Sequence, residues 1–216
     1  MEKLLEKKYK VKRTANSTKN RIAHTKEEFW SSANILNEFS SPWVATELVK
    51  TEFRALHDSE YFYFKFRVFD TDLHIDLTDN SKMSINDSDR VELFFRKDEQ
   101  MNPYYCLEMD TQARLFDFIA YPEKKFDYRW NWPKNSIELE AKKSNQFFEV
   151  VGLILKSSLI EFGLLKDNRI QTGIFRAKYN MQSNGDYKPT WITWIDPNTL
   201  EPNFHCATAF GLLEFE

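Results

Sequence analysis

The stretch "EYFYFKFRVFD", residues 60–70, decides the fold because apolar and more polar side chains alternate along it. Such a period of two residues is typical of a β-strand. One face carries Phe62, Phe64, Phe66 and Val68, and the other carries Tyr61, Tyr63, Lys65 and Arg67. Residues 46–58 also alternate in their first half, and His57, Asp58 and Ser59 form a polar bend between the two segments. Together they predict a β-hairpin with one buried face.

Further strand patterns follow at short intervals along the rest of the chain. They lie at residues 90–98, 103–121 (two strands joined at 110–113), 136–159 (two strands with a Ser-Asn turn), 169–181, 190–195 and 209–216. The long helical stretches that a parallel βαβ sheet needs are missing. We therefore expect an all-β chain folded as an antiparallel β-sandwich, two sheets of the jelly-roll or immunoglobulin-like kind. A short helical or irregular segment at residues 25–39 precedes it.

Length and composition favour one globular domain. The chain has 216 residues, of which 42% are hydrophobic and 29% charged, with only 5 Gly and 7 Pro. Neither an internal repeat nor a shift in composition marks a domain boundary. We expect a single domain at residues 25–216 and an N-terminal arm at residues 1–24. The basic run "EKKYKVKRTANSTKNR" (6–21) within that arm is expected to be solvated and mobile.

Charge and hydropathy exclude several classes of partner. A formal net charge of -3 provides no basic field for nucleic acid. No apolar run approaches the roughly 20 residues of a transmembrane helix. The chain would be cytoplasmic if Met1 is its natural start, and secreted or periplasmic if a leader was removed. Cys106 and Cys206 are far apart in the sequence and are expected to be free thiols.

Clustered acidic residues raise the question of a metal. Asp87, Asp89 and Glu92 lie close together in "NDSDRVELFF" (86–95). Carboxylates can hold a hard cation such as calcium, but the glycine typical of a calcium loop is missing. We expect no cofactor, with Asp87 and Asp89 as weak calcium candidates. An ion pair that involves Arg90 or Arg176 is the favoured alternative.

The segment "YYCLEMD" (104–110) places Glu108 on one face with Cys106 and Asp110, so this face is expected to border solvent or a pocket. Arg176 lies in a comparable strand, "GIFRAKY" (173–179). Two interpretations remain open. Glu108 and Arg176 either form a buried ion pair or face a ligand.

Aromatic residues make up 16% of the chain. Trp130 and Trp132 lie in the loop "FDYRWNWPKN" (126–135), where they could form a lid or platform, or Trp132 could plug the end of the core. Trp191 and Trp194 project to opposite faces of their strand, so one of them belongs to the core.

Sequence motifs for catalysis are missing. The chain contains no G-x-S-x-G, no H-E-x-x-H and no phosphate-binding glycine loop, and its four histidines are scattered. A non-enzyme is favoured. A glycoside-active enzyme with a carboxylate pair stays as an alternative.

The order of segments resembles the family 9 carbohydrate-binding modules over residues 25–216. The segments that carry the resemblance are Trp30, "EYFYFKFRVFD", "DSDRVELFF", "YYCLEMD", "GIFRAKY", "TWITWIDP", "FH" and "AFGLLEF". It implies a DOMON-type β-sandwich, as in bacterial polysaccharide-degrading systems, that binds sugars without catalysis and often accompanies a glycoside hydrolase. Of the two tryptophans that enclose a sugar in the family, the first is replaced within "SIND" (84–87). Phe204 and His205 are nearest to the second.

The leading hypothesis is a protein that binds a poly- or oligosaccharide by aromatic stacking and by hydrogen bonds from charged side chains. Its candidate binding residues are Glu108, Trp130, Trp132, Arg176, Trp191, Trp194, Phe204 and His205. The alternative from another class is a haem b electron-transfer domain of the DOMON type. Its ligands would be His205 with Met109 or Met181.

Overall fold

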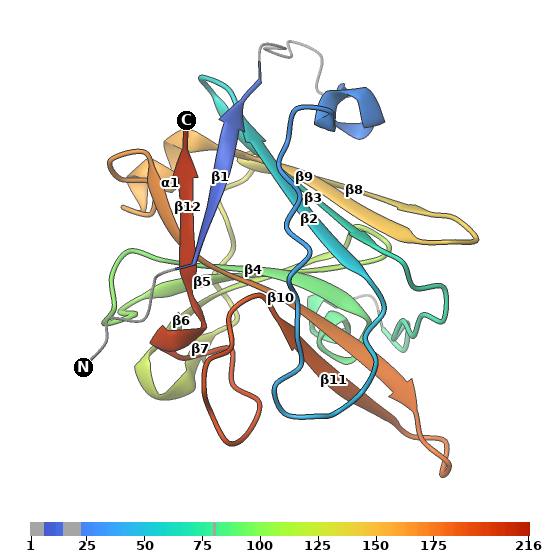
Figure 1. Cartoon of the computed structure of the whole chain (residues 1–216). Helices are drawn as coiled ribbons and strands as arrows, with labels where there is room; N and C mark the ends of the chain where they lie inside the picture. Colours follow the sequence, from blue (N-terminus) through green and yellow to red (C-terminus); the bar gives the residue numbers. More distant parts are fainter. Residues whose placement is uncertain (1–6, 15–22, 80) are drawn as a thin grey trace.

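The computed structural model describes residues 7–14, 23–79 and 81–216, and its twelve strands form one large curled sheet (Figure 1). Its strand order is β7-β6-β5-β4-β10-β12-β1-β2-β3-β9-β8, with β11 paired to β10. The strands are β1 (Lys8–Arg13), β2 (Thr51–His57), β3 (Tyr61–Val68), β4 (Arg90–Arg96), β5 (Tyr104–Asp110), β6 (Leu115–Tyr121), β7 (Lys125–Asp127), β8 (Ile137–Lys143), β9 (Phe148–Leu155), β10 (Arg169–Met181), β11 (Tyr187–Thr193) and β12 (Gly211–Phe215). The helical elements are α1 (Lys156–Glu161) and the 3-10 turns η1 (Ala23–Thr25), η2 (Glu27–Trp30), η3 (Lys82–Asp87), η4 (Pro122–Lys124) and η5 (Ala207–Ala209).

The predicted hairpin is confirmed as β2 and β3, which pair antiparallel. Its turn is closed by the carboxylate of Asp58, which accepts hydrogen bonds from the backbone N–H groups of Glu60 (2.8 Å) and Tyr61 (2.7 Å). The Tyr63 hydroxyl donates a third hydrogen bond to the same carboxylate (2.8 Å). The predicted pairs β5–β6 and β8–β9 are also confirmed.

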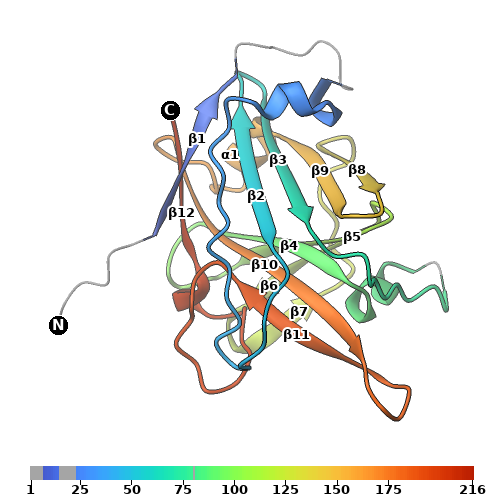
Figure 2. The same cartoon turned by 45° about the vertical axis from the view of Figure 1, so that its right-hand side comes forward.

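The sheet is mixed, because β1 runs parallel to both of its neighbours, β12 and β2. Strand β1 joins the two antiparallel groups into one continuous path, so the sheet curls as a half-barrel (Figure 2). The prediction of a mostly β chain is confirmed. The prediction that all pairing is antiparallel is wrong at β1, and a sandwich of two separate sheets is not confirmed.

Residues 8–13 correct the expectation of a solvated arm. Tyr9 and Val11 of β1 are 4% and 0% exposed, and they alternate with lysines. Lys8 and Lys10 are exposed and form ion pairs with Glu214 and Glu216. The basic composition concealed a period of two residues in "KYKVKR". Residues 1–6 and 15–22 of the predicted arm lie outside the described residues.

The main core lies between the two antiparallel groups and contains the apolar face of β3. The prediction of a single buried face is wrong for this strand. Tyr63 on the other face is 0% exposed, because η2 places Phe29 and Trp30 over it. Lys65 on that face is buried as well, and its ammonium pairs with Glu149 at 2.8 Å.

A second buried layer covers the opposite side of β6, β5, β4, β10 and β11. We call this side the second face; its strand residues include Arg90, Glu92, Phe94, Tyr104, Glu108, Phe116, Phe175 and Trp191. Residues 202–210 and Trp43 pack on it, and the Trp43 indole N–H donates to the Thr199 carbonyl at 3.0 Å. Strands β4 and β5, which lie between the main core and the second face, are therefore buried on both sides.

Candidate functional site

A pocket of about 200 Å³ opens at the second face. It is formed by β11, the turn η4 and the connection between β11 and β12. The residues that line it are Lys124, Trp191, Pro202, Asn203, Phe204 and His205. The pocket therefore combines aromatic rings with an ammonium, an amide and an imidazole.

Trp191 is the tryptophan of this pocket. Its register, opposite Ala177 on β10 and through it Arg90 on β4, places its indole on the second face. The ring is half-buried, and the Arg90 guanidinium lies 5.5 Å from its centre. Trp194, three residues later, is 2% exposed in the main core. The two tryptophans thus project to opposite faces, as the alternation predicted.

Phe204 supports the pocket wall from behind. Its ring is 5% exposed and stacks on Phe175, with 4.1 Å between ring centres and planes 10° apart. Its edge-to-face contact with Trp191 has a centroid distance of 5.4 Å. Because its ring is largely covered, Phe204 fixes the orientation of Trp191 more than it offers a stacking surface.

His205 is held as a neutral side chain. Its Nδ1 lies 3.0 Å from the Tyr104 hydroxyl, and its ring stacks on Phe94 with 5.1 Å between centres. Burial, and then the positive charges of Lys124 and Arg90, lower the pKa of His205 to about 3. A neutral imidazole can both donate and accept a hydrogen bond.

A buried ion cluster lies next to Trp191. The Arg90 Nε is 2.6 Å from a Glu108 carboxylate oxygen and 2.9 Å from one of Glu92. Glu92 and Glu108 are directly opposite each other on β4 and β5, and all three side chains are at most 5% exposed. We call Arg90, Glu92 and Glu108 the acid–arginine cluster.

Two carboxylates share one guanidinium in the acid–arginine cluster, and this imbalance changes their protonation. Burial raises the pKa of Glu92 to about 8, with repulsion from Glu108 as the second cause. Burial also raises the pKa of Glu108. The cluster therefore holds a proton at neutral pH, since like charges this close do not both ionise.

Arg176 does not pair with Glu108. Glu92 lies opposite Phe175 in the register, so the next residue of β10, Arg176, projects to the other face of the sheet. There it is 0% exposed, and its guanidinium donates to the carboxylate of Asp70. The hypothesis of a joint Arg176–Glu108 pair is wrong, because the two side chains lie on opposite faces.

Trp130 and Trp132 lie away from the pocket. Trp132 is 4% exposed in the main core, and its indole N–H donates to the Ser158 hydroxyl at 3.1 Å. Trp130 is half-buried against Tyr105, with 5.3 Å between ring centres, on the side opposite Tyr104. Trp132 therefore plugs the core, the alternative that the sequence left open, and neither side chain lines the pocket.

Asp87 and Asp89, the candidate calcium ligands, have different surroundings. Asp89 is 0% exposed, and its carboxylate accepts the backbone N–H groups of Tyr179 (2.6 Å) and His74 (2.7 Å), whereas Asp87 is exposed. Within residues 7–14, 23–79 and 81–216, no group of three or more His, Cys, Asp or Glu side chains is placed to hold a metal ion.

The haem alternative is wrong about its ligands. Met109 is 0% exposed in the main core, on the opposite side of the sheet from His205. Met181 is 67% exposed at the end of β10. The structure brings His205 together with neither methionine.

The ion pair with Arg90 that the sequence favoured over a metal site is confirmed, since Arg90 pairs with Glu92. Sequence reasoning did not place Arg90 or Glu92 beside the pocket, and it missed Lys124 and Asn203. A signal existed for Arg90 and Glu92. In "RVELFFR" the charged residues Arg90 and Glu92 alternate with Val91 and Leu93, which is the pattern of a polar second face. Lys124 and Asn203 lie outside strands, where no periodicity locates a side chain.

The chain belongs to the carbohydrate family 9 binding domain-like family, whose pattern it matches over residues 22–216. Domains of this family are non-catalytic carbohydrate-binding modules. The chain is accordingly a module of a binding family and not an enzyme. No curated protein matches it. Among the described residues, no helix is long and apolar enough to cross a membrane.

Solved structures support the fold. A candidate carbohydrate-binding protein from Bacteroides uniformis superposes with a TM-score of 0.73 at 15% identity, covering 98% of this chain and 100% of that one. A family 9 module from Caldicellulosiruptor kristjanssonii in complex with glucose gives a TM-score of 0.59 at 14% identity, covering 97% and 96%. A family 9 module from C. kristjanssonii in complex with cellotriose gives a TM-score of 0.59 at 14% identity, covering 97% of this chain and 94% of that one.

Proposed function

We propose that this protein binds carbohydrate in the pocket at the second face. The observation that carries the proposal is the half-buried Trp191 at a pocket whose other walls bear Lys124, Asn203 and His205. A sugar ring has apolar C–H faces and a rim of hydroxyls. An aromatic ring beside convergent polar groups matches both features.

The ligand class follows from the chemistry of the walls. Asn203 and His205 offer donors and acceptors to hydroxyls, and Lys124 offers donors. The small volume of the pocket favours one end of a sugar chain over a long stretch of polymer. Since the family 9 module of C. kristjanssonii has been solved with glucose and with cellotriose, a neutral gluco-oligosaccharide is the first ligand to test.

The acid–arginine cluster supports this site from within the sheet. Arg90 contacts Trp191 and is held by Glu92 and Glu108, so it fixes the position of the indole. Because the ring is already held in place, it loses less conformational entropy when a sugar stacks on it. We further propose that the module serves polysaccharide breakdown beside a glycoside hydrolase, as the family resemblance implies.

Isothermal titration with cellotriose, followed by a panel of other neutral oligosaccharides, tests the proposal. Trp191→Ala should abolish measurable binding, because it removes the ring on which the sugar face stacks; the stacking of a nucleobase on one aromatic ring, for scale, is worth about 1–3 kcal/mol. Trp130→Ala is the matched control: it removes the same side chain, also half-buried, from the other side of the sheet. Absence of binding by the wild type across the panel, or equal losses in both variants, would overturn the proposal.

A further inference from the structure

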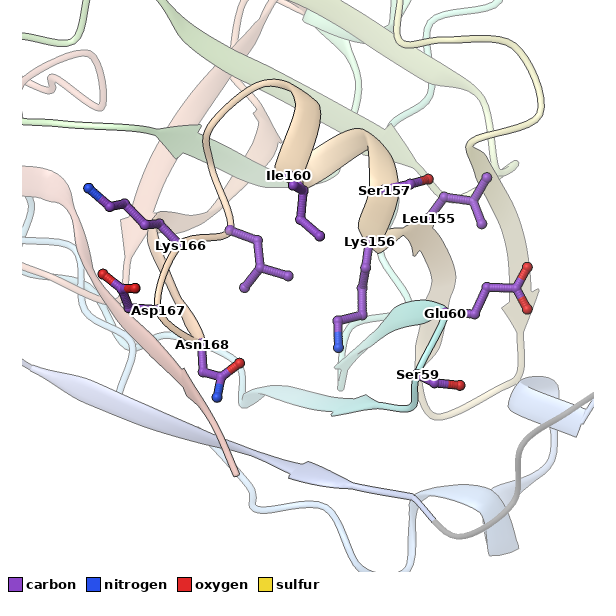
Figure 3. A pocket seen from close by; sticks show the side chains of 10 residues that line it. Ser59, Glu60, Leu155, Lys156, Ser157, Ile160, Lys166, Asp167 and Asn168 are labelled. Carbon is purple, nitrogen blue, oxygen red and sulfur yellow. The ribbon is translucent and has the colours of Figure 1, made fainter.

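A second and larger cavity, of about 910 Å³, lies apart from the pocket at the second face and shares no lining residue with it (Figure 3). Three segments surround it: the turn between β2 and β3, the junction of β9 with α1, and the turn before β10. Its lining residues are Ser59, Glu60, Leu155, Lys156, Ser157, Ile160, Leu165, Lys166, Asp167 and Asn168.

Lys156 is the polar centre of this cavity. Its side chain points into the cavity, is half-buried, and has its Nζ 3.0 Å from the Asp58 carbonyl oxygen. Among the described residues no carboxylate lies within 4.0 Å of this ammonium. The nearby Asp58 carboxylate is turned toward Glu60, Tyr61 and Tyr63. Lys156 therefore forms no direct ion pair among the described residues, and its Nζ lies 5.7 Å from the centre of the Phe215 ring.

His57 leaves one donor of Lys156 free. The His57 Nδ1 lies 3.4 Å from the Lys156 Nζ and 3.2 Å from the Asp58 carbonyl oxygen, and its Nε2 lies 2.8 Å from the main-chain oxygen of Glu216. The Lys156 ammonium has three N–H groups. The Asp58 carbonyl and the His57 Nδ1 can take at most two of them, so one is available to a ligand.

The rest of the lining supplies an apolar surface and an amide. Ile160 is 58% exposed and points into the cavity (Figure 3), and Leu165 also lines it. Asn168 contributes its side-chain amide. The carboxylates of Glu60 and Asp167 point away from the centre (Figure 3). A ligand inside would thus meet one cation, one amide and a strip of aliphatic carbon.

We propose that this cavity is a second ligand site, for a hydroxylated organic carboxylate of the uronic acid type. The carboxylate would take the free donor of Lys156, the C–H face of the ring would lie on Ile160, and hydroxyls would reach Asn168. A charge-assisted hydrogen bond in a half-buried setting is the strongest contact available there. The site works independently of the pocket that contains Trp191.

Titration of the intact protein with D-glucuronate, observed at 13C-labelled isoleucine methyl groups, tests this site. The Ile160 methyl resonance should shift and saturate with glucuronate, but it should stay in place with the same concentration of glucose. Lys156→Met should raise the dissociation constant at least tenfold. Two controls should leave it unchanged: Lys166→Met, whose ammonium points outward, and Trp191→Ala, at the other pocket.

The outcomes separate the two sites. An Ile160 methyl that ignores glucuronate, an equal response to glucose, or equal losses in Lys156→Met and Lys166→Met would each overturn the second site. If Lys156→Met fails to fold, the wild-type titration repeated at high salt decides, because an ion-paired carboxylate must bind more weakly as salt rises. Failure of the wild type to bind any of the neutral oligosaccharides would overturn only the first proposal.

Discussion

The two faces of the β4, β5 and β10 sheet are equally buried but differ in how they treat charge. On the core face, Arg176 is 0% exposed and its guanidinium donates to Asp70, while the Lys178 ammonium lies 3.6 Å from Asp70 and 3.3 Å from Asp89, so two cations face two buried carboxylates. On the second face, the single guanidinium of Arg90 pairs with both Glu92 and Glu108. The same guanidinium contacts the ring of the half-buried Trp191, which lines the pocket. Charges are therefore balanced on the core face, whereas the buried cluster on the second face has one carboxylate in excess next to the pocket.

This difference assigns stability to one face and binding to the other. Substitutions on the core face should cost free energy of unfolding and leave affinity intact wherever the chain still folds. Substitutions of side chains that line the pocket at the second face should lower affinity and cost little free energy of unfolding. Four experiments test this division between the faces, and their expected effects decrease in order.

The two tryptophans of β11 and its end should separate stability from binding most strongly. Trp194→Ala should lower the free energy of unfolding by about 4 kcal/mol, because it opens a cavity in the main core. Trp191→Ala should cost roughly 1 kcal/mol and abolish sugar binding, since its ring is half-buried. Urea denaturation and titration calorimetry on the same samples check both. Similar unfolding free energies for the two variants would break the division.

Arg176→Met should destabilise the protein by about 3 kcal/mol, because it leaves the Asp70 carboxylate buried without its main partner. Affinity for oligosaccharide should change less than twofold at a temperature where the variant is folded. Denaturation curves and calorimetry measure the two effects. Lost affinity in a folded variant would place Arg176 in binding and contradict the account.

Glu92→Gln should alter how stability depends on pH. The pKa of Glu92 is raised from 4.5 to about 8, so between these values the folded chain holds a proton that the unfolded chain has released. Wild-type stability should therefore fall as pH rises through this window, by at most about 1.4 kcal/mol per pH unit, and level off above it. The variant should lose most of that slope. Melting temperatures across this range test it, and identical slopes would argue against a shared proton.

His205 should give the smallest effect, an absence of titration near neutrality. Its pKa is lowered to about 3, so the ring should stay neutral down to about pH 4.5, far below the ordinary midpoint of roughly 6.5. The unfolded chain does gain this proton, so the His205 contribution to stability declines as pH falls from about 6.5 toward 3. Imidazole resonances followed by NMR should stay constant through neutral pH. A midpoint of 6 to 7, roughly the unperturbed value, would show that the ring is solvated.

Local patterning was enough to predict most strands. Period-two alternation located the hairpin at residues 60–70 and the strands that follow, because side-chain alternation is a property of each strand alone. The parallel position of β1 was missed because Tyr9 and Val11 are masked by lysines within a basic run. The second buried face of β3 was missed because a distant segment, η2, provides its cover.

The site was only partly predictable for a similar reason. Alternation correctly separated Trp191 from Trp194, since that requires only the strand itself. It could not separate Arg176 from Glu108, because their faces depend on the register between β10, β4 and β5. Lys124 and Asn203 reach the pocket from outside the strands, so their role follows only from tertiary structure.

The most direct test of the central claim is a fluorine NMR titration with 5-fluorotryptophan incorporated at all 6 tryptophans, using cellotriose as the probe. The account predicts that the Trp191 resonance shifts with saturation while those of Trp130, Trp132 and Trp194 stay in place. Assignment by single Trp→Phe variants identifies each signal. A shift of Trp130 with a constant Trp191 would place the sugar on the other side of the sheet and contradict the account.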